Sequence, residues 1–275
     1  MTLEKLLKND HAAFKALLAG DSAANSLLDT LEKPGHDVYG IWNNGTLVGG
    51  AELEHDKNAF LYVYIARQFR KNGFGTMAVR LCEKELETDA PNRIETYYLN
   101  GDEGAKAFAG KLGYVYRFSS ALMRYCGGAY ELPSLPVRGY EDADYLAAQQ
   151  LSARAFHEMR LRVGTFPDSV LQQPSDAMRE NWKDSAQERF VYVKDGEIIG
   201  HAHLEGDAID SVSIKPEAQG KGIGRLFVKC LCNKILESGH ASVTLYCVVG
   251  NWARSLYESL GFREEYIEDY AVKTL

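Results

Sequence analysis

The sequence contains few cysteines and prolines, and it has no long hydrophobic run. Its five cysteines (Cys82, Cys126, Cys230, Cys232 and Cys247) are odd in number and form no Cys-x-x-Cys motif, which argues against a disulfide framework or a zinc knuckle. We therefore expect them to be buried and reduced. No apolar segment approaches the roughly 20 residues that span a bilayer, and the first residues lack the features of a signal peptide. We expect no membrane partner and a cytoplasmic location.

Positive charge is also scarce. The chain has 31 Lys and Arg against 38 Asp and Glu, a net charge of −7, and most of the acidic excess falls after residue 130. Because nucleic acid binding needs a basic surface, a nucleic acid partner is disfavoured. An acidic half could instead attract a cationic substrate. The composition, 45% hydrophobic and 25% charged, is that of a globular protein, and 275 residues predict about two domains of roughly 150 residues each.

An internal repeat is present. LYVYIARQFRKNGFGT (61–76) aligns with DSVSIKPEAQGKGIGR (210–225) at an offset of 149, and AKAFAGKLGY (105–114) aligns with ARSLYESLGF (253–262) at an offset of 148. Two blocks in the same order at nearly the same offset indicate two copies of one domain.

Each copy predicts a β-hairpin, a third strand, a glycine-rich loop and a helix, and then a further strand and a short helix. The fold class is therefore α/β with a mixed sheet (α+β), in two tandem domains. No opening strand is recognisable in the first copy. The expected strands are 38–43, 46–54 and 59–65 in the first copy, and 137–140, 189–194, 197–205, 208–214 and 242–249 in the second. The expected helices of the second copy are 143–158, 174–185, the one that ends at Gly239, and 252–260. We expect domains at 1–126 and 137–275, joined by a linker over 127–136.

The glycine cluster of the second copy, Gln219 to Gly224, lies between an expected strand and an expected helix. Successive glycines let a ligand approach the backbone, and the amides and dipole of a helix start favour a phosphate. A Walker loop needs Gly-Lys-Ser/Thr, but Lys221 is followed by Gly222. The dinucleotide fingerprint does not fit either, because Phe227 stands where its third glycine or alanine belongs.

The cluster and the block after it resemble the GNAT superfamily of acyl-CoA-dependent N-acetyltransferases. The resemblance covers about 135 residues of the second half and, more weakly, residues 38 to 125. The matching residues are Val212, Ile214, Pro216, Gln219, Gly222, Gly224, Asn251, Ala253, Tyr257, Gly261 and Phe262.

This resemblance implies an acetyl-CoA site in the second copy. The backbone of Val212, Ser213 and Ile214 would pair with the pantetheine arm, and Tyr257 would protonate the departing thiolate. Asn251 would contact the cofactor, although it stands two residues before the helix alanine where the family usually has three. The loop residues implied to hold the pyrophosphate are Gln219, Gly220, Lys221, Gly222, Ile223, Gly224 and Arg225.

A general base is needed as well, because an amine with a pKa near 10.4 is mostly protonated at pH 7. Asp210 is the preferred candidate, since by period two it would share a face with Val212 and Ile214; Glu205 is the alternative. His201 and His203 share one strand face, but no third ligand is evident and we expect no metal.

The first copy keeps Arg70, Gly73 and Gly75, which predicts a second phosphate cradle. Its chemistry is eroded, because Ala109 stands at the position of Tyr257 and Leu61 at that of Asp210. We expect the first domain to support the second or to hold cofactor without turnover.

The sequence thus predicts an N-acetyltransferase that moves an acetyl group from acetyl-CoA to a small-molecule amine, or less favourably to a protein amine, by direct attack in a ternary complex. The alternatives are a non-catalytic acyl-CoA sensor and an aminoacyl transferase. The acceptor site should be formed by residues 157–187, where Arg160 and Arg162 could bind a carboxylate. The oligomeric state is not readable.

Overall fold

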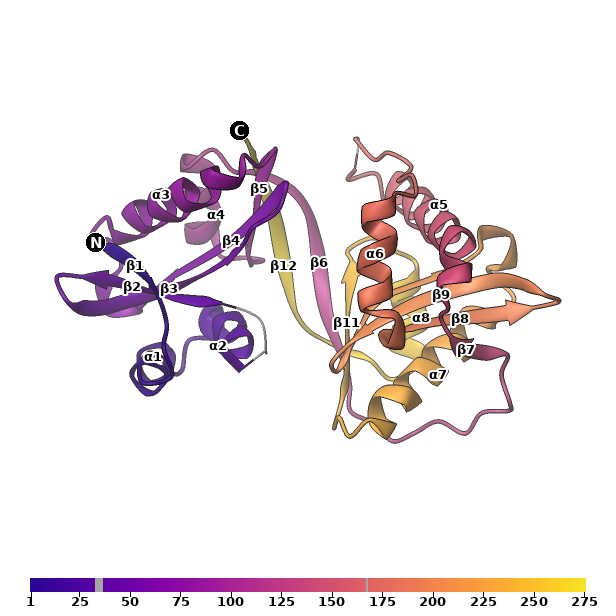
Figure 1. The fold of residues 1–275 in the computed structure, drawn as a ribbon. Helices are drawn as coiled ribbons and strands as arrows, with labels where there is room; N and C mark the ends of the chain where they lie inside the picture. Colours follow the sequence, from indigo (N-terminus) through magenta and orange to yellow (C-terminus); the bar gives the residue numbers. More distant parts are fainter. Residues whose placement is uncertain (33–36, 167) are drawn as a thin grey trace. The chain divides into compact units, whose positions relative to one another are not determined.

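The computed structural model of the protein describes residues 1–32, 37–166 and 168–275. These residues form two compact units (Figure 1). The first unit comprises Met1–Arg117 and Glu268–Leu275, and the second comprises Phe118–Ile267. No helix in the described part of the chain is long and apolar enough to cross a membrane.

The first unit contains a mixed sheet with the strand order β1-β2-β3-β4-β5-β12. All neighbours are antiparallel except β4 and β5, which run parallel and pair from Asn58↔Arg93 to Phe60↔Glu95. The strands are β1 (Thr2–Lys5), β2 (Val38–Asn43), β3 (Thr46–Glu54), β4 (Asn58–Ile65), β5 (Arg93–Leu99) and the 268–274 part of β12 (Arg263–Thr274).

Helices cover both faces of this sheet. Alternate residues of β4 point to opposite faces, so Tyr62 and Tyr64 pack with α1 (His11–Leu18) and α2 (Asn25–Glu32). On the other face, Leu61 and Ile65 pack with α3 (Phe74–Leu86) and with Ala109 of α4 (Glu103–Lys111).

The second unit repeats this plan with the strand order β6-β11-β10-β9-β8-β7. Its one parallel pair within the described residues is β10 with β11, joined at Ala208↔Thr244. The strands are the 120–125 part of β6 (Val115–Tyr125), β7 (Val137–Gly139), β8 (Arg189–Lys194), β9 (Glu197–Glu205), β10 (Ala208–Ile214) and β11 (Val243–Val248).

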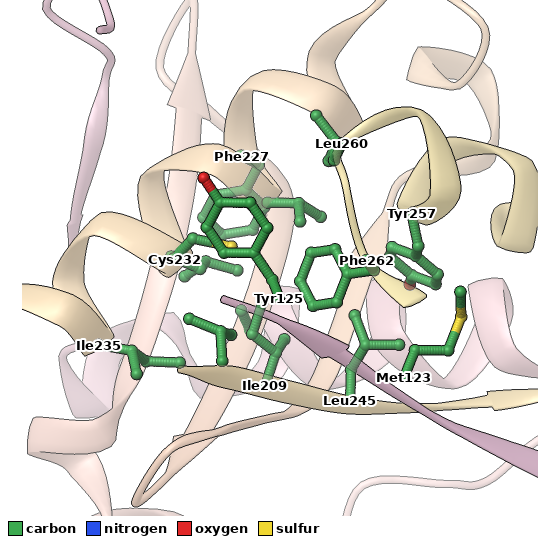
Figure 2. Close-up of a cluster of buried hydrophobic side chains, with 14 of the residues drawn as sticks. Met123, Tyr125, Ile209, Phe227, Cys232, Ile235, Leu245, Tyr257, Leu260 and Phe262 are labelled. Atoms are coloured by element: carbon green, nitrogen blue, oxygen red, sulfur yellow. The ribbon is translucent and has the colours of Figure 1, made fainter. Parts of the chain in front are cut away.

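The core of the second unit lies between its sheet and α7 (Ile223–Glu237), with α8 (Ala253–Ser259) beside it. Figure 2 shows Phe227 of α7 and Phe262, which follows α8, packed among strand side chains. Both phenylalanines are fully buried, and truncating either to alanine would cost about 3–5 kcal/mol. α5 (Tyr145–Val163) and α6 (Asp176–Asp184) cover the opposite face, where Trp182 stacks on His201.

Several expected elements have the observed bounds, one strand was not recognised, and one expectation is wrong. β2, β3, β8 and β9 begin and end where the sequence placed them. The first copy does have an opening strand, since Thr2–Lys5 pairs with β2; only one of its four residues is even half-buried, so its apolar signal is weak. Cys126 is exposed, whereas we expected every cysteine to be buried.

The two compact units do not follow the expected repeat boundary. The first unit takes its last strand from the C-terminal residues 268–274, and β6 completes the sheet of the second unit. The expected linker 127–136 carries no regular element but belongs to the second unit, where the Tyr130 hydroxyl donates a hydrogen bond to the carbonyl of Leu260 (2.5 Å). The assignment of 1–126 and 137–275 as the homologous domains stays a prediction.

A buried aspartate connects the helical segment of the first unit to its glycine loop. The Asp21 carboxylate accepts hydrogen bonds from Tyr64 Oη (2.9 Å), Arg67 Nε (2.9 Å) and Arg70 Nη2 (2.8 Å). Burial alone would raise the pKa of Asp21, but these bonds and one from the Ala23 amide outweigh it and hold the pKa at about 2. The ionised carboxylate therefore stabilises the folded unit above pH 4, and this contribution is lost as the pH falls from about 4 to about 2.

We predict that Asp21→Asn lowers the free energy of unfolding of the first unit by about 2 kcal/mol at pH 7, because the lowered pKa corresponds to that free energy. The difference from the wild type should narrow as the pH falls below 4. Urea denaturation between pH 7 and pH 3, with β4 followed by hydrogen-exchange mass spectrometry, measures both. The control is Asp37→Asn, which breaks an exposed ion pair with Lys5 (2.6 Å) and should cost less than about 1 kcal/mol. Equal losses for the two variants would contradict the prediction.

Candidate active site

The site of the second unit begins where its parallel strands separate. β10 and β11 pair at Ala208↔Thr244, and beyond that point a cavity of about 460 Å³ lies between them. Backbone residues 209–214 of β10 line one side of the cavity, and Leu245, Tyr246 and Val248 of β11 line the other. Backbone groups on the separated edges have lost their neighbouring strand, so an extended ligand with amide groups could pair with them.

The glycine loop forms one end of this cavity. Gly222 is the N-cap of α7 with φ +80°, and Gly220 has φ +73°, so both adopt the left-handed conformation that glycine allows. A Cβ added at either position would meet no atom within 4 Å, which leaves the backbone open to a ligand. The first amides of α7 have no carbonyl partner within the helix, and with the helix dipole they suit a phosphate.

Gln219 fixes the loop to the end of β10. Its Nε2 donates a hydrogen bond to the carbonyl of Ile214 (2.9 Å). Arg225, in the first turn of α7, lines the same end of the cavity and donates to Ser259 Oγ of α8 (2.8 Å). The loop therefore presents open backbone amides and a guanidinium, a donor set that matches a diphosphate.

Tyr257 reaches the cavity from α8. Its ring is 8% exposed and packs edge-on against Phe262, with centroids 5.9 Å apart (Figure 2). Burial, followed by the nearby Cys247 thiol, raises the pKa of the Tyr257 hydroxyl above its usual value. The hydroxyl is therefore protonated at neutral pH and can act as a proton donor inside the cavity.

The two histidines of β9 lie on the face that α5 and α6 cover. The His201 ring stacks on Trp182 (centroids 4.5 Å apart, planes at 8°), and its Nδ1 is 3.0 Å from Ser152 Oγ of α5. Burial, followed by Arg189 and His203, lowers the pKa of His201 to about 3, so its ring is neutral at pH 7. In the described part of the chain, no three His, Cys, Asp or Glu residues are grouped to hold a metal ion.

A β-bulge places Asp210 differently from its expected position. Ile209 pairs with Leu204 and Ser211 pairs with His203, which leaves Asp210 as an extra residue in β10. Its Oδ2 lies 2.9 Å from Nδ1 of His203, so its carboxylate is on the α5–α6 face.

The expectation that Asp210 shares a face with Val212 and Ile214 is therefore wrong, because those two side chains pack on the α7 side. One extra residue shifts the alternation of a strand by one position, and a period-two argument cannot detect it. Asp210 still lines the cavity, at the point where the strands separate.

The expected cofactor residues of the second unit meet at this cavity, with two exceptions. The Lys221 amine donates to the Glu217 carbonyl (2.8 Å), and Ile223 packs against the core; neither lines the cavity. Asn251 lines it, but its side-chain oxygen already accepts a hydrogen bond from the amide of Ala253, the first residue of α8 (3.0 Å). The lining residues are Val212, Ser213, Ile214, Gln219, Gly220, Gly222, Gly224, Arg225 and Asn251.

Sequence reasoning missed the part of the wall that α5 and the start of α8 supply. Ala155, Phe156 and Met159 line the cavity from α5, and Trp252 lines it from the residue that precedes α8. Two of the three α5 residues precede the segment 157–187 that we expected to form the acceptor site. The three-residue spacing of Phe156 and Met159 places both on one face of a helix, and this spacing could have indicated a shared apolar wall.

The first unit has a cradle of the same backbone geometry. Gly73 is the N-cap of α3 with φ +81°, and Arg70 Nε donates to the carbonyl of Ile65 (2.7 Å) as Gln219 does to Ile214. Lys71 stands at the position of Gly220 and adopts φ +65°, a conformation that costs a non-glycine residue about 1 kcal/mol. Arg70, Gly73 and Gly75 line a cavity of about 530 Å³.

Side chains that are small in the second unit are large in the first. Ser211 and Ser213 correspond to Tyr62 and Tyr64 of β4. The Tyr64 hydroxyl donates to Asp21 (2.9 Å), and that of Tyr62 donates to a backbone carbonyl between α1 and α2. The tyrosines thus close the α1–α2 side of the first unit, and β4 has no bulge among its paired residues.

Family comparisons agree with this geometry. Residues 147–271 match a family model described as the acetyltransferase (GNAT) domain, and residues 5–114 match one described as the acetyltransferase (GNAT) family. Two curated relatives named mycothiol acetyltransferase align with most of the chain. The protein from Pseudarthrobacter chlorophenolicus is 26% identical over 89% of this chain and 80% of its own, and that from an Arthrobacter species is 24% identical over 90% and 81%.

Solved structures show the same fold. A GCN5-related N-acetyltransferase from Sphaerobacter thermophilus superposes with a TM-score of 0.68 at 17% identity, over 99% of this chain and 95% of that one. A tandem GNAT protein from the clavulanic acid biosynthesis pathway superposes with a TM-score of 0.61 at 15% identity, over 99% and 98%.

We predict that Gly222→Ala weakens CoA binding at least tenfold, because its Cβ would occupy the space next to the loop backbone. Isothermal titration of CoA measures the effect. The matched control is Gly196→Ala, in the β8–β9 turn, which has φ +78° and equally open surroundings. It should lose a similar amount of stability and bind CoA like the wild type. Equal CoA affinities for the two variants would contradict the phosphate cradle.

Proposed function

The chain belongs to the GNAT superfamily of acetyltransferases as a tandem of two such domains, and because their sites differ we propose that the second unit carries the transfer. It moves an acetyl group from acetyl-CoA to the primary amine of a small molecule. The observation that carries the assignment is Tyr257, a buried proton donor at the cavity, where the first unit has Ala109. The use of an acyl-CoA donor follows from the family; acetyl-CoA itself and the amine are the proposal.

The second unit has the parts that an acyl-CoA needs. The cavity extends from the separated strands to the glycine loop, and the positions beside Gly220 and Gly222 are open. Arg225 and the first amides of α7 would hold the diphosphate. The edge of β10 from Val212 to Ile214 would pair with the pantetheine amides.

The proposed reaction is a direct attack. The amine nitrogen forms a bond to the thioester carbonyl carbon, the C–S bond breaks, and the thiolate takes the proton of the Tyr257 hydroxyl. The amine releases one proton, for which Asp210, a carboxylate that lines the cavity, is the candidate acceptor, directly or through water. Placing this acid and this base at one cavity provides assistance of about 10²–10⁴-fold.

A small-molecule acceptor is favoured over a protein amine. Both curated relatives are named for the acetylation of mycothiol, a small molecule.

We predict that Tyr257→Phe lowers kcat about 100-fold and leaves the KM for acetyl-CoA nearly unchanged, because it removes the proton donor and keeps the ring. Release of CoA thiol in the presence of a panel of amines measures both constants. The control is Tyr192→Phe, a buried core tyrosine of the same unit, which should keep its activity. An unchanged kcat for Tyr257→Phe would show that Tyr257 is not the proton donor, and it would overturn the assignment of acetyl transfer to the second unit.

The base is tested by a second pair of variants. We predict that Asp210→Asn lowers kcat at pH 7 at least tenfold, and that the loss shrinks as the pH rises toward 10, because a growing share of the amine is then deprotonated in solution. Glu205→Gln, an exposed carboxylate at the end of β9, is the control and should keep its rate. A loss of rate in Glu205→Gln with an unchanged rate in Asp210→Asn would assign the role of the base to Glu205.

A further inference from the structure

Two arginines in the last turn of α5, Arg160 and Arg162, contact aromatic rings that line the cavity, and neither has an acidic partner among the described residues. The guanidinium carbon of Arg162 lies 4.3 Å from the ring centroid of Trp252, and that of Arg160 lies 6.0 Å from the centroids of Phe156 and Phe166. Phe156 and Trp252 both line the cavity. The aromatic rings therefore fix two cations beside the proposed acceptor site.

Half of the arginines in this unit lie in ion pairs with carboxylates, and Arg160 and Arg162 belong to the other half. Among its described residues, neither Arg160 nor Arg162 has a carboxylate oxygen within 4.0 Å. Glu158 of α5 and Glu217 are both engaged by Arg154 (3.0 and 2.6 Å). By contrast, five arginines lie 2.6 to 2.7 Å from an acidic side chain: Arg124, Arg138, Arg154, Arg179 and Arg254.

Arg160 is half-buried, and its surroundings favour the arrival of an anion. Burial lowers its pKa, and no opposing charge compensates. A guanidinium presents five N–H donors in a rigid fork that matches a carboxylate or a phosphate. A ligand anion would thus neutralise a partly desolvated cation and occupy its donors at once.

We propose that Arg160, assisted by Arg162, binds an anionic group of the acceptor, so that the acceptor is an amine that also carries a carboxylate. This inference rests on the proposed function of the second unit. α5 covers the face opposite α7, whose N-terminus forms the phosphate cradle, and Arg225 already serves that cradle. Asp210 lies on the α5 face and suits the ammonium of the same ligand. Positive and negative side chains on one face thus match the two charged groups of an aminocarboxylate. The alternative anion for these arginines is a phosphate of CoA.

Matched amine pairs test the proposal. Acetyl transfer is measured with L-lysine against cadaverine and with L-ornithine against putrescine, pairs that differ by the carboxylate. The wild type should prefer the amino acids about 10–100-fold in kcat/KM. Arg160→Gln should abolish the preference with an unchanged KM for acetyl-CoA, and Arg160→Lys should retain part of it. Arg154→Gln, an exposed arginine of the same helix, is the control and should keep the preference.

A binding measurement separates this inference from the proposed function. The same four compounds are titrated into wild-type protein saturated with CoA. If the amino acids bind more tightly than the diamines but are never acetylated, the anion site is supported and the proposed acetyl transfer is overturned. Equal behaviour of acids and diamines in both assays would overturn the anion site. A raised KM for acetyl-CoA in Arg160→Gln, with the amine preference intact, would overturn it too and assign these arginines to a cofactor phosphate.

Discussion

The site depends on the separation of two parallel strands. Once β10 and β11 part beyond Ala208↔Thr244, the backbone groups on their facing edges need partners that the sheet no longer supplies. Gly222 starts α7 at the far end of that opening, so the amides of the helix face the same space. The separated strands, the glycine loop and Tyr257 therefore line one cavity, which this interruption of the sheet opens.

The two units share this backbone and differ in side chains. The Gln219–Ile214 and Arg70–Ile65 hydrogen bonds are equivalent, and Lys71 keeps a left-handed conformation that a glycine would adopt without strain. A geometry kept despite strain indicates that the loop is fixed by its neighbours, Arg70 and Asp21 above all. The first unit has Ala109 at the position of Tyr257, and Tyr62 and Tyr64 of β4 close its α1–α2 side, so the two units share a fold and differ in the side chains at the cavity.

Local signals predicted much of this architecture, and long-range pairing was the part that they missed. The Asp195–Gly196 turn fixed the ends of β8 and β9, since a two-residue hairpin sets the register on both sides. The glycine pattern located both loops that lead into a helix through a left-handed glycine N-cap. No local pattern indicates that residues 268–274 pair with β5, because this partner is some 170 positions away. The bulge at Asp210 was equally hidden, since a single inserted residue keeps the apolar composition of the strand.

That bulge lets one strand serve both faces of the sheet. Beyond it, Val212 and Ile214 keep their packing on the α7 side, where the loop and Tyr257 lie. At the bulge, Asp210 turns to the α5 side, where His203 pairs with it and Arg160 has no acidic partner among the described residues. A strand of strict alternation could not keep Ile209 in the core and also turn Asp210 and Ser211 together away from it. The bulge at Asp210 therefore lets β10 contribute side chains both to the α7 face, with the glycine loop and Tyr257, and to the α5 face, the proposed acceptor side.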